Sequence, residues 1–153
     1  MSGSQHDRQQ LLKTARALCV SICMKAPVDE YLEHFAPDEE GVSAVEHGLG
    51  SMYLAPYVGQ IFEGRTGVRE YFGWKREIVK TISLRFEEYV VDDEAGVVSV
   101  RCRGKFLWRE TQNEWEEVST ARLTFGEKGM VTKFEWWGDT GAAFLASRGK
   151  LRK

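Results

Sequence analysis

The sequence predicts a single α+β domain, in which helices from the first half of the chain pack on a curved antiparallel sheet from the second half. Residues 8–25 place apolar side chains at helical spacing, and residues 82–139 alternate apolar and polar side chains between short turns. The length of 153 residues fits one domain. We expect a flexible N-terminus over 1–9, the domain over 10–147 and a basic tail over 148–153.

Three helices are predicted before the meander. The first covers 8–25 and ends at Pro27, because proline removes a backbone donor. A short second helix places Tyr31 on its apolar face, and a third covers about 66–80. The apolar positions of these last two helices are Val28, Tyr31, Leu32, Phe35, Val68, Tyr71, Phe72, Ile78 and Val79.

Short strands are expected over 42–47 and 57–62, between the helices. The meander then turns at 92–96, 111–114 and 126–129, where glycine and polar residues gather. A final helix over 140–147 has Asp139 at its N-cap position.

The hairpin turn at 111–114 sets a register for the meander. Trp108 is expected opposite Glu117, and Gly104 opposite Ala121. The two small residues either leave room for a cavity or admit a helix. The predicted inner wall consists of Val100, Cys102, Gly104, Phe106, Trp108, Ser119, Ala121, Leu123, Phe125, Met130, Thr132, Phe134 and Trp136.

The outer face of the sheet carries an apolar group beside many charges. Leu107, Val118 and Trp137 form this group. Monomers seldom expose such patches, so we expect a homodimer through the outer face.

Composition excludes several classes of function. The formal net charge of -2 gives no basic field for nucleic acid. We expect no membrane association, since no long apolar run or signal segment is present. Three cysteines without metal-like pairing suit a reducing, cytoplasmic compartment. No metal is expected from the scattered His6, His34 and His47, and no cofactor, because the chain lacks a phosphate loop and a dinucleotide fingerprint.

Three segments give the chain a family resemblance. Phe35-Ala36-Pro37-Asp38 followed by Val45-Glu46-His47, the stretch 64–72, and the ending 136–139 resemble the nuclear transport factor 2-like superfamily. The resemblance is greatest to the branch of ketosteroid isomerase and SnoaL-like polyketide cyclases, and covers 10–147. It implies a cone-shaped α+β barrel, a dimer through the outer sheet face, and a deep pocket between sheet and helices. Function does not follow from this fold.

His47 is the leading catalytic candidate. It matches the position where the resembled isomerases carry a carboxylate base, and we expect it to face the cavity together with Val45. A histidine there exchanges protons near neutral pH. The alternative is a buried histidine that hydrogen-bonds the backbone.

The resemblance also shows departures from known mechanisms. The positions of the isomerases' oxyanion donors match Cys19 and Ala121, neither of which donates strongly. Where epoxide hydrolases carry an Asp–Arg–Asp arrangement, the inward positions of this chain are Cys102, Gly104 and Trp136. The chain therefore lacks the residues that both mechanisms require.

Tyrosines supply further candidates. Tyr31, Tyr53 and Tyr57 could each donate a hydrogen bond to a substrate carbonyl or pack as ordinary core. We expect Glu117 to reach solvent and Asp139 to cap its helix. The expected substrate pocket comprises Cys19, Val45, Phe72, Cys102, Gly104, Phe106, Trp108, Ser119, Ala121, Thr132, Phe134 and Trp136.

Two hypotheses follow from the sequence. One is a cofactor-independent acid–base enzyme (an isomerase, cyclase or dehydratase) for a small hydrophobic, polycyclic metabolite bound in the apolar pocket, with His47 moving the proton. The other is a non-catalytic protein of the same fold that binds a small ligand or serves as a dimeric scaffold.

Overall fold

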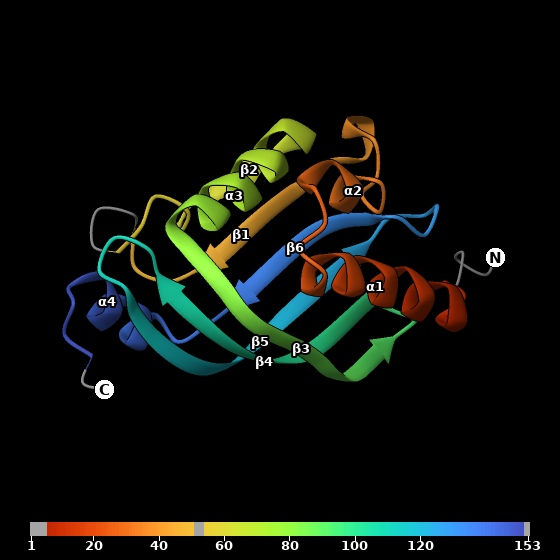
Figure 1. Cartoon of the computed structure of the whole chain (residues 1–153). Coiled ribbons are helices and arrows are strands. Elements are labelled where there is room, and N and C mark those ends of the chain that lie inside the picture. Colours follow the sequence, from red (N-terminus) through yellow and green to blue (C-terminus); the bar gives the residue numbers. More distant parts are fainter. Residues whose placement is uncertain (1–5, 51–53, 152–153) are drawn as a thin grey trace.

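The computed structural model describes residues 6–50 and 54–151 as one six-stranded sheet with helices on its concave face (Figure 1). The elements in chain order are α1 (Arg8–Cys23), α2 (Val28–Leu32), the 3-10 turn η1 (Asp38–Glu40), β1 (Ser43–His47), β2 (Ile61–Glu63), α3 (Gly64–Ile78), β3 (Val79–Asp92), β4 (Val97–Trp108), β5 (Asn113–Phe125), β6 (Val131–Trp137) and α4 (Thr140–Ser147). The predicted α+β class is confirmed.

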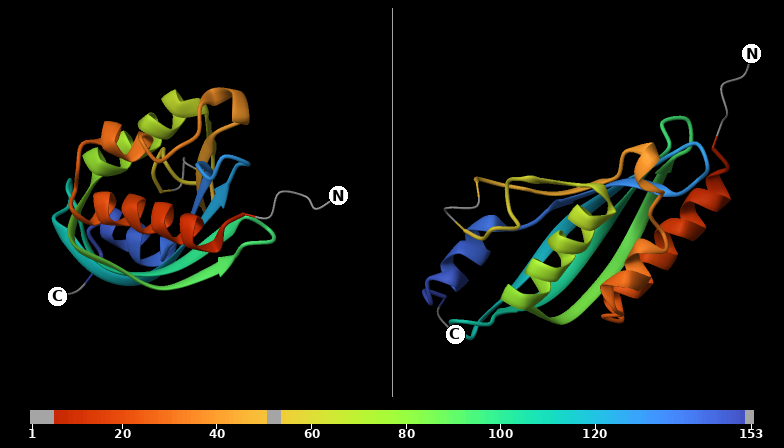
Figure 2. Two further views of the ribbon diagram at one scale, coloured as in Figure 1. Left: turned by 90° about the vertical axis from the view of Figure 1, so that its right-hand side faces the viewer. Right: turned by 90° about the horizontal axis from the view of Figure 1, so that it is seen from above.

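The sheet is open and mixed. Its strand order is β2-β1-β6-β5-β4-β3, and β1 pairs parallel with β6 while the other neighbours pair antiparallel. The expectation of a purely antiparallel sheet was therefore wrong at one pair of strands. Figure 2 shows α1 and α3 inside the curve of the sheet, with α4 and the start of α1 at opposite ends of the molecule.

The helix ends follow the local sequence. The Asp7 side chain caps α1 by accepting from the Gln9 and Gln10 backbone amides, and Asp139 caps α4 by accepting from the Ala142 amide, as predicted. The third helix runs directly into β3, because Val79 already has extended backbone angles.

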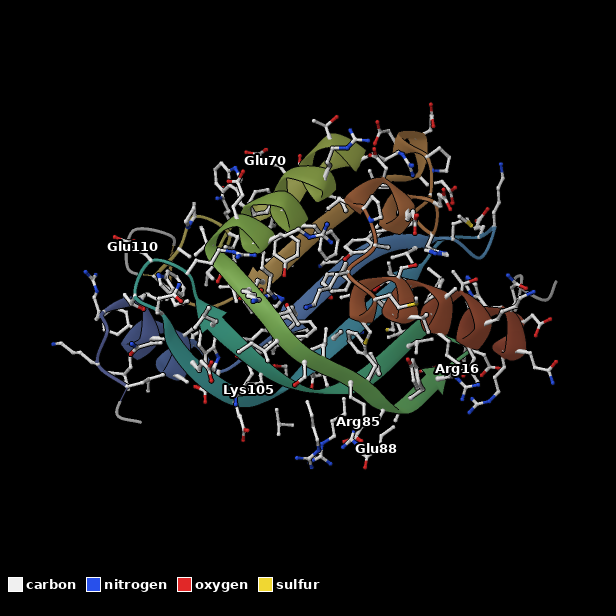
Figure 3. The ribbon with its side chains drawn as sticks, in the orientation of Figure 1. Arg16, Glu70, Arg85, Glu88, Lys105 and Glu110 are labelled. Carbon is white, nitrogen blue, oxygen red and sulfur yellow. The ribbon has the colours of Figure 1, made fainter. Side chains whose placement is uncertain are left out.

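Irregularities in β3 curve the edge of the sheet. Its pairing with β4 shifts between Glu87 and Val90, where Glu88 adopts a φ of 59°. Such a bulge bends the strand and increases its twist. Figure 3 shows Arg85, Glu88 and Lys105 pointing away from the helices, so the convex face of β3 and β4 is charged.

The hairpin between β4 and β5 has a different register from the one predicted. Trp108 pairs with Asn113 and Gly104 with Glu117, because the turn occupies 109–112. The slip is an even number of residues, so the predicted faces of both strands hold. In place of the strand predicted over 57–62, the structure has the shorter β2, which begins at Ile61 and ends at Glu63.

Aromatic side chains fill much of the space between sheet and helices. Phe134 and Trp136 stack with ring centroids 6.3 Å apart, and Phe72 meets Phe134 edge-on at 5.1 Å. All three are buried. Gly104 makes room for a neighbouring side chain, since a Cβ there would lie 2.5 Å from the Phe106 ring. On this side the Phe106 ring, and not a helix, occupies the space beside Gly104.

Candidate functional site

Glu46 is the charged residue that β1 directs into the interior. Because β1 runs parallel to β6, Ala44 lies beside Phe134 and Glu46 beside Trp136, both on the concave face. Only 7% of Glu46 is exposed. A carboxylate so enclosed requires hydrogen bonds or an opposite charge.

Two side chains of α3 supply these partners. The Tyr71 hydroxyl and the Lys75 ammonium donate to the same Glu46 oxygen, Oε1, at 2.8 and 2.7 Å. Tyr71 and Lys75 are four residues apart and so share one helix face. The Lys75 Nζ also lies 4.3 Å from the centre of the Trp136 ring. The ion pair is thus held between α3, β1 and β6.

Glu117 is a second carboxylate on the inner wall, where β5 reaches the loop before α4. It accepts from Trp115 Nε1 at 2.7 Å, from the Ser119 hydroxyl, and from the Asp139 amide at 3.3 Å. Glu117 is half-buried, so it reaches solvent in part while these donors orient its carboxylate.

Tyr57 and Tyr71 remain protonated donors near these carboxylates. Burial, followed by the negative charge of Glu46, raises the pKa of both hydroxyls well above the ordinary tyrosine value. Glu117 contributes in the same direction to both pKa values. The Tyr57 hydroxyl therefore lies within the field of both carboxylates and keeps its proton at neutral pH.

A small cavity joins these groups. Its volume is about 20 Å³, which accommodates about one water molecule. Glu46, Tyr57, Lys75 and Glu117 line it together. The remaining lining residues are Leu54, Val79, Phe106, Trp115, Trp136, Gly138, Asp139, Thr140 and Ala143.

A larger cavity of about 300 Å³ adjoins the small one and shares Lys75 and Val79 with it. Its other lining residues are Ile22, Lys25, Tyr31, Phe72, Arg76, Lys80, Thr81 and Arg109. This volume is at the lower end of that found for small-molecule sites.

The structure places His47 on the convex face, outside the cavity. Its Nε2 lies 2.8 Å from Glu135 Oε2, and its ring stacks on Trp137 with centroids 4.4 Å apart. Val45 pairs with Glu135 and shares this outer face. The expected orientation was wrong by one residue, because pairing with β6 turns Glu46 inward and its neighbours outward.

The predicted tyrosines have different surroundings. Tyr57 lines the small cavity, and Tyr31 lines the larger one, where its hydroxyl accepts from Arg76 at 2.5 Å. Tyr53 lies outside the described residues.

Few of the predicted pocket residues line a shared space. Phe106 and Trp136 line the small cavity, and Phe72 lines the larger one. Ser119 bonds Glu117, and Thr132 donates to the Thr124 carbonyl at the far end of β6. The rest divide between packed interior and other surfaces: Cys19, Cys102, Ala121 and Phe134 are buried in the core, while Gly104 and Trp108 line two separate open pockets of about 610 and 570 Å³.

Sequence reasoning missed Glu46 and Lys75. One signal was present, since Lys75 follows Tyr71 by four residues and Phe72 by three, and so had to share the buried face of its helix. A lysine at such a position requires an anionic partner or an outlet to solvent.

Two further features of the described chain bear on function. Within residues 6–50 and 54–151, no three His, Cys, Asp or Glu side chains gather as a metal site requires. No helix in these ranges is long and apolar enough to cross a membrane.

Comparison with known proteins identifies the fold. No protein-family model and no curated protein sequence matches the chain. Among solved structures, an NTF2-like protein of unknown function from Burkholderia pseudomallei K96243 is similar at a TM-score of 0.74 and 16% identity, covering 90% of this chain and 96% of its own. A proposed SnoaL-like polyketide cyclase from Jannaschia sp. CCS1 gives a TM-score of 0.69, 13% identity and 95% coverage of both chains.

A proposed isomerase from Bacillus subtilis is also similar, with a TM-score of 0.72, 11% identity, and coverage of 95% of this chain and 97% of its own. The protein therefore has the nuclear transport factor 2-like fold. At these identities the likeness defines the fold, and the chemistry must be argued from the site.

Proposed function

We propose that the protein is a cofactor-independent acid–base enzyme that acts on a small, largely apolar molecule, with Glu46 as the proton-transfer group. The observation that carries this proposal is the inward carboxylate of Glu46, 2.7 Å from Lys75 and beside the protonated hydroxyl of Tyr57. The folds of a proposed isomerase and a proposed polyketide cyclase are similar to this one, which is consistent with such chemistry.

The arrangement suits an isomerisation through an enolate. Glu46 removes a proton from the carbon next to a substrate carbonyl, and negative charge develops on the carbonyl oxygen. Tyr57 and Lys75 donate hydrogen bonds to that oxygen. They would thus serve as the oxyanion donors that Cys19 and Ala121 cannot supply. Glu46 then returns the same proton to another carbon, so the reaction consumes no further reagent and the carboxylate is regenerated.

Hydrogen exchange tests this mechanism without knowledge of the product. The protein is incubated in D₂O with a panel of cyclic and aryl ketones, and exchange of the α-proton is followed by NMR. We expect Glu46→Gln to reduce exchange at least 100-fold. Glu135→Gln, a glutamate on the outer face of the neighbouring strand, is the matched control and should keep the wild-type rate. Equal rates for wild type and Glu46→Gln would refute the proposal.

A second function, binding without catalysis, is favoured by one observation. The small cavity holds about one water molecule, and Phe134 and Trp136 fill the interior behind it. A binding protein would retain a small hydrophobic ligand in the larger cavity and show no exchange with any ketone. Native mass spectrometry of protein purified without added ligand would detect the retained molecule.

We also propose a homodimer through the convex face of the sheet. Val118 is 51% exposed and Trp137 is 40% exposed, whereas Leu107 is partly buried and lies apart from them, beside Lys80 and Glu114. Charges of both signs surround Val118, including Arg103 on the next strand, so two copies can match opposite charges. Sedimentation of Trp137→Glu should show monomers if this face forms the interface; an unchanged dimer would exclude it.

A further inference from the structure

Every ionic side chain that lines the larger cavity is positively charged. Lys25, Arg76, Lys80 and Arg109 surround it together with the stem of Lys75, and no aspartate or glutamate is among its lining residues. Its apolar wall comprises Ile22, Tyr31, Phe72 and Val79. The protein as a whole carries a formal charge of -2, so this concentration of cations is local.

Apart from Lys75, these cations lack anionic partners in the described part of the chain. Lys75 pairs with Glu46, but no carboxylate there lies within 4 Å of the other four. Arg76 donates to the Ala26 carbonyl at 2.8 Å and to the Tyr31 hydroxyl. Arg109 donates to the Arg76 carbonyl at 3.1 Å. Because these acceptors are neutral, they orient both guanidinium groups without cancelling their charge.

Helix dipoles explain only part of this arrangement. Arg76 lies in the last turn of α3 and Lys25 follows the end of α1, where a cation is favourable. Arg109 also donates to the Arg76 carbonyl in the last turn of α3, so the end of that helix helps to place it, whereas Lys80 is already on β3. Apolar walls beside such charges strengthen their field toward an anion that enters the cavity.

We propose that the substrate is an amphipathic anion, in which one carboxylate or phosphate group is attached to a flat apolar skeleton. Arg76, Lys80 and Arg109 bind the anionic group, and the skeleton lies along Phe72 and Val79. Since Lys75 and Val79 line both cavities, the far end of the skeleton reaches Lys75 and Glu46. This last step rests on the proposed function, whereas the anion site itself does not.

Binding of four probes tests the inference by calorimetry at low salt. 2-Naphthoate and 1-naphthyl phosphate carry the anion, 2-naphthamide has the same ring system without charge, and inorganic phosphate has no skeleton. We expect at least one naphthyl anion to bind tenfold or more tightly than the amide, and the tighter of the two identifies the anionic group. Equal affinity for amide and both anions would overturn the inference, as would inorganic phosphate binding as tightly as naphthyl phosphate.

A charge-matched pair of variants localises the effect. Lys80→Gln with Arg109→Gln should weaken anion binding at least tenfold and leave amide binding unchanged, which also shows that the variant is folded. Lys13→Gln with Lys128→Gln removes the same charge from exposed positions elsewhere and should bind as wild type. Equal losses in both double variants would overturn the assignment to this cavity.

The Glu46→Gln variant separates this inference from the proposed function. It should bind the naphthyl anion at least as tightly as the wild type does, because Lys75 loses its anionic partner, although the variant fails to exchange the α-proton of a ketone. Anion-selective binding together with Glu46-independent exchange would refute the catalytic proposal alone. Glu46-dependent exchange without anion selectivity would refute the anion site alone.

Discussion

Adjacent residues of β1 make close side-chain contacts in two different environments. Glu46 faces inward, where it meets Lys75 with only 9% of its side chain exposed. His47 faces outward to Glu135, and 38% of the histidine side chain is exposed. Both contacts span 2.7–2.8 Å, so distance does not distinguish them. Burial does, because an interior charge that loses its partner cannot be stabilised by water.

The largest expected effect comes from removing the inner cation. Lys75→Met leaves Glu46 buried without its ammonium partner, which should lower the free energy of unfolding by about 3 kcal/mol. Urea denaturation of this variant measures the loss. Adding Glu46→Gln should recover part of it, since the double variant buries no lone charge. A loss below about 0.5 kcal/mol in the single variant would show that the pair is effectively solvated.

The density of the inner wall predicts the next effect. Gly104→Ala places a Cβ against the Phe106 ring and should destabilise the protein by about 2 kcal/mol in thermal or chemical unfolding. Gly73→Ala on α3 is the control, because a Cβ there meets nothing within 4 Å, and it should stabilise the helix slightly. If both alanines behave alike, the inner wall has spare room.

Alkaline pH tests the interior through Cys19. Burial raises the pKa of this thiol from 9.0 to about 12. Above pH 9 the unfolded chain releases this proton while the folded protein keeps it, so stability falls as pH rises. Cys19 alone lowers the free energy of unfolding by about 1.4 kcal/mol at pH 10, and by about the same amount again for each further pH unit up to pH 12.

Unfolding of Cys19→Ala across pH 8–11 measures this contribution. The free energy of unfolding of the variant should fall less steeply with rising pH than that of the wild type, and the difference should equal the contribution of Cys19. Cys23→Ala should change the slope less, because Cys23 is only half-buried. An unaltered slope in Cys19→Ala would mean that the thiol ionises freely in the folded state.

The outer contact should contribute least. His47→Ala is expected to cost less than about 1 kcal/mol in urea denaturation, since its pair with Glu135 is partly exposed. Its rate of ketone exchange should equal that of the wild type. A large drop in that rate would show that His47, on the outer face of β1, takes part in the reaction, which contradicts the assignment of the chemistry to the inner face.

The sequence predicted those features that depend on neighbours close in the chain. Asp139 as the cap of α4 and the faces of β4 and β5 follow from short-range spacing and alternation. The orientation of β1 does not. This strand has five residues, and the apolar Val45 favoured the wrong face. Its partner, β6, lies far along the chain, with Glu135 88 residues after His47, so local pattern could not fix which face turns inward.

The site was hidden for the same reason. Glu46 and Lys75 become partners only when β1 joins the sheet beneath α3. The face of Glu117 follows from alternation along β5, but the backbone donor it meets at Asp139, in the loop before α4, does not. Tyr57 was identified because a tyrosine beside an irregular segment is conspicuous in sequence, whereas paired charges on a helix and a strand are not.

The direct junction of α3 with β3 couples the proposed chemistry to the edge of the sheet. Lys75, Arg76 and Lys80 lie within six residues that contain no loop, on one continuous run of helix and strand. The backbone of this junction therefore sets the spacing between the cations proposed to bind the anion and the ammonium group beside Glu46.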